Sequence, residues 1–118
     1  MSYQSFEDLE VWKKALAISV KVYDILKDTR DYGLKDQMTR AAVSIASNIA
    51  EGAERDSKAE FVRFLHIAKS SAAELRTQVY IANRIKIISD QKTEELVDEL
   101  IILSKQLHAL IKHIKPKT

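Results

Sequence analysis

The chain of 118 residues is 46% hydrophobic and 31% charged, and its formal net charge of +2 is too small to indicate a nucleic-acid ligand by itself. The length fits a single domain, residues 1–118, and the absence of cysteine excludes disulfide bonds, zinc ribbons and thiol chemistry. No apolar run is long enough to cross a bilayer, and the acidic start MSYQSFEDLE does not resemble a secretory signal. We therefore expect a cytoplasmic protein without a membrane partner.

Only two glycines and one proline interrupt the chain, which favours a few long helices over the many turns of a β-protein. Apolar periodicities predict helices near residues 6–27, 34–52, 58–84 and 90–114. Short connections between long helices place consecutive helices antiparallel. The expected fold is all-α, an up-down-up-down antiparallel four-helix bundle.

The first helix, with Ser5 as its expected cap, carries two apolar stripes instead of one. The first stripe consists of Leu9, Trp12, Leu16, Ser19, Tyr23 and Leu26, and the second of Val11, Ala15, Ile18, Val22 and Ile25. A bundle core needs only one stripe, so we expect the second to make a contact outside the protomer. The residues expected at this homo-oligomer interface are Val11, Ile18, Val22 and Ile25.

The second helix contains the segment RAAVSIASNIAEG, residues 40–52, which is charged only at its ends. Its polar residues fall in one stripe, formed by Gln37, Arg40, Ser44, Asn48, Glu51 and Arg55. Apolar or small residues fill the other faces, so this helix is expected to be buried on several sides. Gly52 is expected to end it in a left-handed conformation.

The third helix carries a matching polar stripe of Glu60, Arg63, Ser70, Glu74 and Gln78. If helices two and three are antiparallel neighbours, residues whose numbers sum to about 114 lie level. The level pairs are Arg55 with Glu60, Glu51 with Arg63, Ser44 with Ser70, Arg40 with Glu74, and Gln37 with Gln78. Because buried polar groups need partners, we interpret the stripes as a structural polar seam, and a ligand site is the alternative. Arg40 and Glu74 are expected to be partly buried, so that loss of Arg40 costs about 2 to 4 kcal/mol.

Motifs for catalysis and for metal or cofactor binding are absent. Di-iron bundles use Glu-x-x-His, but the residues three positions before His66, His108 and His113 are arginine, lysine and leucine. The chain also lacks His-Glu-x-x-His, a glycine-rich phosphate loop and a nucleophile elbow. We therefore expect no enzyme activity, no metal and no cofactor.

A basic stripe on the outer side of the third helix is the candidate nucleic-acid contact. It consists of Lys58, Lys69, Arg76 and Arg84 with Tyr80 between them, and it contains no acidic residue. Cations of this kind bind phosphates, and an interleaved aromatic ring can stack on a base. The alternative is a charged, solvated helix face without a ligand.

Three segments and the leucine-rich last helix together resemble one family. The segments are FEDLEVWKKA at residues 6–15, QMTRAAVSIASNIAEG at residues 37–52, and FVRFLHIAKSSAAEL at residues 61–75. They resemble the 23S rRNA-intervening sequence protein family, also called four helix bundle proteins. The chain departs from that pattern in lacking a proline in the first connection and in having Lys86 where the family usually has glycine.

The family resemblance implies the same fold and a self-associating protein. Members are similar to the accessory variability protein of diversity-generating retroelements, a pentameric barrel of four-helix protomers that binds nucleic acid and a reverse transcriptase. The resemblance thus implies a homopentamer and, more weakly, binding of RNA or single-stranded DNA without sequence specificity. The alternative function is a structural scaffold whose partner is another protein.

Overall fold

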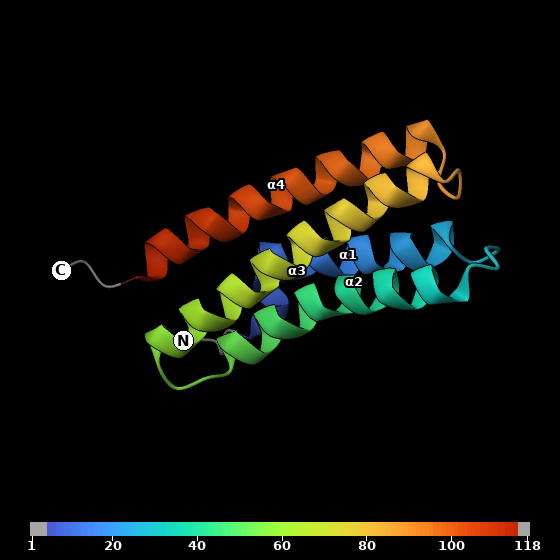
Figure 1. Ribbon diagram of the computed structural model, residues 1–118. Coiled ribbons are helices and arrows are strands. Elements are labelled where there is room, and N and C mark those ends of the chain that lie inside the picture. The colour runs from blue at the N-terminus through green and yellow to red at the C-terminus, as the bar shows by residue number, and fades with distance from the viewer. Residues whose placement is uncertain (1–4, 116–118) are drawn as a thin grey trace.

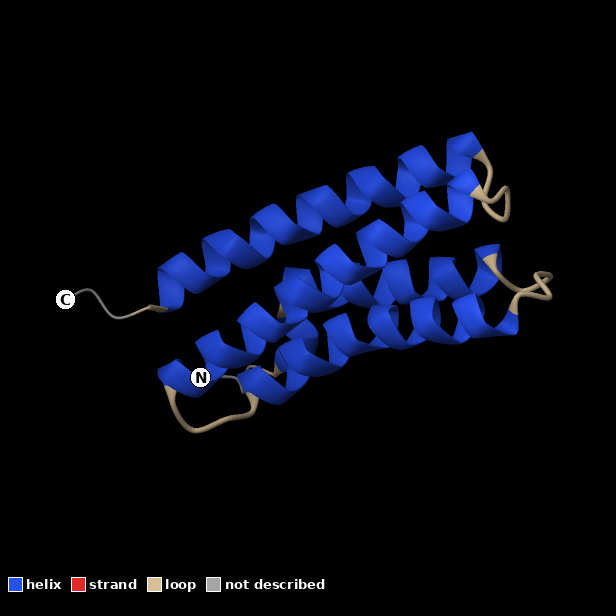
Figure 2. Ribbon diagram, in the orientation of Figure 1, coloured by secondary structure: helices blue, strands red, loops and turns tan. Residues whose placement is uncertain are grey.

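The computed structural model describes residues 5–115. Over this range the chain forms a short 3-10 helix, η1 (Phe6–Asp8), and four α-helices, α1 (Glu10–Ile25), α2 (Tyr32–Ala53), α3 (Lys58–Arg84) and α4 (Asp90–Ile114). The described part of the chain contains no strand (Figure 2). Each helix runs antiparallel to the next in an elongated bundle (Figure 1). The all-helical fold predicted from the sequence is therefore confirmed.

The ends of the helices follow from their caps. The Ser57 and Ser89 hydroxyls accept hydrogen bonds from the backbone of Glu60 and Lys92, and α3 and α4 begin and end where the sequence predicts. The cap at Ser5 opens only η1, and Leu9 then adopts an extended conformation before α1 begins at Glu10. The first helix is thus shorter than expected, because its predicted start forms a separate turn.

Neither glycine adopts a left-handed conformation. Gly33 and Gly52 both lie within α2 and have no positive φ, so the expectation of a left-handed C-cap at Gly52 is wrong. A Cβ atom at position 52 would lie 2.6 Å from Cβ of Phe64 in α3, so this glycine allows the two helices to approach closely. Among the described non-glycine residues, Lys86 adopts the left-handed conformation, with a φ of 68°.

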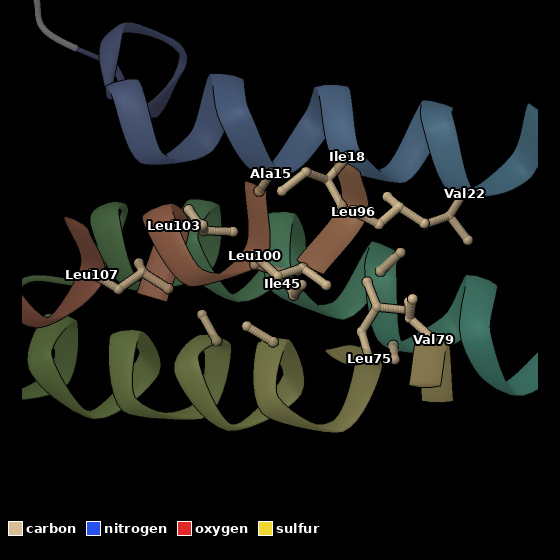
Figure 3. Close-up of a cluster of buried hydrophobic side chains, with 14 of the residues drawn as sticks. Ala15, Ile18, Val22, Ile45, Leu75, Val79, Leu96, Leu100, Leu103 and Leu107 are labelled. Atoms are coloured by element: carbon tan, nitrogen blue, oxygen red, sulfur yellow. The ribbon is translucent and has the colours of Figure 1, made fainter. Parts of the chain in front are cut away.

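The core runs along the centre of the bundle and takes one face from each α-helix (Figure 3). Four leucines of α4 point into it, Leu96, Leu100, Leu103 and Leu107, all fully buried. Small residues such as Ala15 and Ala42 lie between these large side chains. The alternation of large and small residues lets the four faces interdigitate at the density of a protein interior.

The stripe of α1 that was expected to face a partner faces the core of the protomer instead. Val11, Ile18 and Val22 are buried in the core of the protomer, and Ile25 packs against that core. The other stripe is mixed, because Ser19 and Leu26 are buried while Leu16 is 44% exposed and Tyr23 is 51% exposed. The stripe of β-branched residues and Ala15 packs in the core of the bundle. The stripe with the larger side chains, such as Trp12 and Leu16, lies along the border with α2. The expectation that Val11, Ile18, Val22 and Ile25 face a partner is therefore wrong.

Candidate functional site

The basic stripe predicted on the third helix lies on one face of α3, on the side of α4. Lys58, Arg84 and Tyr80 are exposed, and Tyr80 exposes 46% of its surface. Lys69 and Arg76 are half-buried at the border with α4. These five residues extend along almost the whole of α3. The structure therefore keeps them together on one continuous surface.

Within the described residues, no acidic side chain pairs with any of the four cations on this face. The cations that do form ion pairs in that part of the chain are Lys13, Lys21, Lys27, Arg40, Arg63 and Lys92. Five of these six pairs join residues three or four positions apart in the chain, and four of those five lie within one helix. On the α3 face, in contrast, none of Lys58, Arg76 and Arg84 lies within ion-pair distance of an acid in the described part of the chain. Such cations are free to contact an anion.

The face continues onto α4. The Nζ atom of Lys69 lies 3.3 Å from Nδ1 of His108 in α4, within hydrogen-bond distance. Lys105 and Lys112 flank His108 at three and four residues along the same helix. No acidic residue occurs between Glu99 and the end of α4. The absence of acidic residues from this half of α4 is visible in the sequence, and it could have indicated that His108 belongs to the basic face.

The polar seam between α2 and α3 is shorter than expected and centres on three small side chains. The Ser44 and Ser71 hydroxyl oxygens lie 2.9 Å apart across the two helices. The side-chain amide of Asn48 donates to the Ser44 hydroxyl at 3.0 Å and to the Ser44 carbonyl at 2.8 Å. Ser71 is buried, whereas Ser70, the expected partner of Ser44, is exposed. The sequence therefore placed the partner of Ser44 at the correct level of α3 but one residue too early, at Ser70 instead of Ser71.

The long charged residues of the expected seam do not pair across the helices. Arg40 Nε donates to Asp36 of its own helix at 2.9 Å, and the Arg40 side chain is 79% exposed. Within the described residues, no hydrogen bond or ion pair joins Arg40 to Glu74, Glu51 to Arg63, Arg55 to Glu60, or Gln37 to Gln78. Gln37, Glu51 and Glu74 are exposed, and Gln78 is buried. Because α2 and α3 lie so close together, long side chains leave the interface and pair along their own helix.

Arg63 instead takes part in a small cluster at the α2–α3 turn. It donates two hydrogen bonds to Glu60, which lower the pKa of that carboxyl and raise the pKa of Arg63. The guanidinium groups of Arg55 and Arg63 each lie 4.7 Å from the centre of the Phe64 ring. This ring is the one that Gly52 accommodates from α2. The cluster therefore closes the turn end of the α2–α3 contact with cation–π interactions.

An apolar groove of about 290 Å³ lies on another side of the bundle, between α1 and α2. Its lining consists of Trp12, Leu16, Ser19, Val43, Ala46, Ser47 and Ala50. The Ser19 hydroxyl donates to the carbonyl of Ala42 at 3.0 Å below it, so the base of the groove is satisfied within the protomer. Leu16 and Val43 remain more than two-fifths exposed. This is where the uncharged far side of the second helix meets the bulky stripe of the first.

Neither a metal-binding cluster nor a membrane-spanning helix occurs among the described residues. Between residues 5 and 115, no three His, Cys, Asp or Glu side chains gather closely enough to hold a metal ion. None of the helices in this described range combines the length and the apolar character needed to span a bilayer.

Comparison with known proteins supports the resemblance seen in the sequence. The crystal structure of a protein with unknown function from the S23 ribosomal protein family of Bacteroides thetaiotaomicron VPI-5482 matches this fold with a TM-score of 0.81. It shares 26% sequence identity over 86% of this chain and 98% of that chain. No curated protein matches. The family model for 23S rRNA-intervening sequence proteins matches residues 7–109, and the chain therefore belongs to the 23S rRNA-intervening sequence protein family.

Proposed function

We propose that this protein is a non-enzymatic accessory protein that forms a closed homo-oligomer and binds RNA or single-stranded DNA through the outer face of α3. The observation that carries the proposal is the set of four cations on this face without an acidic partner, Lys58, Lys69, Arg76 and Arg84. Elsewhere in the described chain six cations form an ion pair with an acid, whereas none of the four on this face does. A face that keeps its positive charge unpaired is suited to phosphate.

The chemistry of this face favours backbone contacts over base readout. Lysine ammonium and arginine guanidinium groups bind phosphate oxygens with charge-assisted hydrogen bonds, which carry no sequence information. Tyr80 offers a half-exposed ring on which an unpaired base can stack. The proposed ligand is therefore single-stranded or looped nucleic acid, bound without sequence specificity.

Self-association strengthens this function by repeating the face. We assign the contact between protomers to the α1–α2 groove, because Leu16, Val43 and their neighbours form an apolar surface there. The pentameric stoichiometry is carried over from the resemblance to the retroelement accessory protein. Five copies of a chain with a net charge of +2 have a total charge of about +10, and weak phosphate contacts add through multivalency.

Binding is tested by titrating single-stranded DNA and a structured RNA at several salt concentrations. If four phosphates are contacted per protomer, the affinity for the single strand falls with salt on a logarithmic slope of about −3. The variant Lys69→Glu/Arg76→Glu should bind much more weakly and with roughly half that slope. The matched control Lys13→Glu/Lys92→Glu changes the net charge equally on exposed residues of α1 and α4, and it should retain most of the binding.

Assembly is tested separately by native mass spectrometry. The parent should give a single closed oligomer, and Leu16→Glu/Val43→Glu should give folded protomers. A monomeric parent at micromolar concentration contradicts the proposed assembly. The variant Ile18→Glu is not a test of the interface, because Ile18 is fully buried in the protomer and a charge there prevents folding.

The second candidate function is a scaffold that binds another protein. The apolar groove between α1 and α2 favours it, because a partner helix can pack there as readily as a second copy of this chain. An assembled protein that binds no nucleic acid, even at low salt, favours the scaffold. The α3 face is then a solvated surface.

A further inference from the structure

We propose that Lys69 and His108 form one phosphate site across α3 and α4, and that phosphate binding there is coupled to protonation of His108. This inference rests on the proposed nucleic-acid binding and identifies one contact within it. The two side chains meet at 3.3 Å, from Nζ of Lys69 to Nδ1 of His108. They come from different helices, so the site exists only when α3 and α4 are packed together.

The contact defines which atoms donate and which accept in the free site. A lysine ammonium group has hydrogen-bond donors and no acceptor. In the contact with Lys69, His108 Nδ1 must therefore accept, which requires a neutral imidazole with its proton on Nε2. Protonation of Nδ1 would remove this hydrogen bond and place two cations side by side.

The charged side chains that flank this contact on α3 and α4 are positive. Lys105 and Lys112 lie one turn away on α4. Lys69 faces His108 from α3, with the titratable His66 one turn before Lys69 and Arg76 further along the same face. The acidic residues of α3 are Glu60 and Glu74. Glu60 pairs with Arg63, and Glu74 lines a hollow together with residues of α2. Neither acid therefore offsets the charge beside His108.

A bound phosphate favours the protonated form of His108 at this position. The Lys69 ammonium group can transfer its hydrogen bond from His108 Nδ1 to a phosphate oxygen. Nδ1 then takes up a proton from solvent and donates to a second oxygen of the same group. The phosphate lies between two cations and replaces their repulsion with two charge-assisted hydrogen bonds. Binding therefore takes up protons and becomes tighter as the pH falls through the range in which histidine titrates.

The test measures the affinity of the full-length, assembled protein for single-stranded oligothymidylate at about pH 6 and about pH 8. Neither a phosphodiester nor thymine changes its charge in this range, so the DNA cannot cause a pH dependence. At constant ionic strength, the parent should bind about fivefold more tightly at the lower pH, within the limit of tenfold per pH unit for one linked proton. The variant His108→Gln should show no more than a small change with pH.

The matched control is His113→Gln, which removes a histidine from the same helix but from a position five residues further on, outside the α3 side. This variant should keep the full pH dependence of the parent. Both histidines are exposed, so neither change endangers folding. Calorimetry in two buffers of different ionisation enthalpy provides a second measurement, in which the parent takes up protons on binding and His108→Gln takes up fewer.

Different experimental results would overturn the linked site and the proposed function. Binding of the oligonucleotide with the same affinity at both pH values, or a pH dependence that His108→Gln retains, overturns the linked site and leaves nucleic-acid binding intact. Absence of binding at both pH values overturns both.

Discussion

The contacts between α2 and α3 and between α1 and α4 represent two different ways of joining antiparallel helices. The α2–α3 contact is the most extensive in the bundle, and it is made by small residues such as Gly52, Ser44 and Ser71. The α1–α4 contact is the least extensive between neighbouring helices, and one long ion pair, Lys21 with Glu99 at 2.6 Å, bridges it. The backbones come close in the first pair of helices, whereas long side chains reach across in the second.

This difference indicates where the fold tolerates change. At the α2–α3 contact an added methyl group must displace the neighbouring helix, because close-packed helices cannot absorb extra volume. At the α1–α4 contact, side chains that are part-exposed can reorient at little cost. Substitutions between α2 and α3 should therefore lower the free energy of unfolding strongly, and substitutions between α1 and α4 should lower it only slightly.

The largest expected effect is that of Gly52→Ala. The new Cβ would lie 2.6 Å from Phe64 Cβ and 3.3 Å from the Phe61 carbonyl oxygen, so α2 and α3 must separate. Overpacking outweighs the higher helix propensity of alanine, and we expect a net loss of about 2 to 3 kcal/mol in the free energy of unfolding. Chemical denaturation measures this loss.

The control for this substitution is Gly33→Ala in the first turn of the same helix. The nearest atom to a Cβ there is Asp31 Oδ1, at 3.9 Å, which is ordinary contact distance. This change should stabilise the protein by about 0.5 kcal/mol through helix propensity. If both substitutions have the same effect, the close approach of α2 and α3 is not what Gly52 provides.

The next effect concerns the hydrogen bond between the serines. Ser71→Ala removes the buried partner of Ser44, and we expect it to cost about 1 kcal/mol relative to Ser70→Ala. The neighbouring Ser70 is exposed, so its replacement reports only the helix propensity of alanine. Denaturant midpoints of the two variants give the difference. Equal midpoints would show that the hydrogen bond contributes nothing to stability.

The sequence predicted the helices better than their contacts. Apolar periodicity and serine caps are local signals, and they placed α3 and α4 at the correct residues. The choice between the two stripes of α1 was wrong, because both have the same period and only packing decides which faces inward. Ile18 is fully buried, and Leu16 is 44% exposed. No local signal distinguishes them.

The same limit applies to the candidate site. The cations of α3 share one face because helical spacing determines it, so this part could be read from the sequence. The contact between Lys69 and His108 could not, because it depends on the register of α3 against α4. Gly52 was misread for a similar reason. A glycine near the end of a helix is typical of a C-cap, and the Phe64 side chain that explains it comes from another helix.

A smaller effect is expected at the α1–α4 contact. The hydrogen bond to Glu99 raises the pKa of Lys21 above its ordinary 10.5, with burial acting in the opposite direction. The folded state therefore gains stability that is fully present below the unfolded pKa and is lost as the pH rises through the folded pKa. Because Lys21 is 40% exposed, Lys21→Gln should cost only about 0.5 kcal/mol at neutral pH.

The pH dependence distinguishes this ion pair from simple loss of packing. The stability difference between the parent and Lys21→Gln should shrink above about pH 10.5, as the parent loses its lysine charge. Lys13→Gln is the control on the same helix, since its 3.7 Å pair with Glu10 is more exposed and should contribute nothing measurable. A difference that stays constant with pH would assign the effect of Lys21 to packing.

The smallest effect is expected for Arg40→Ala, where the sequence alone predicted a loss of about 2 to 4 kcal/mol. Arg40 and Glu74 do line one hollow of the surface, so their predicted heights agree with the structure. However, Arg40 is 79% exposed and pairs with Asp36 four residues away on α2, and such pairs contribute about 0.3 to 0.5 kcal/mol. A double-mutant cycle should give this coupling for Arg40 with Asp36 and about zero for Arg40 with Glu74. Coupling of Arg40 to Glu74 above about 1 kcal/mol would show that the polar seam extends beyond its three small residues.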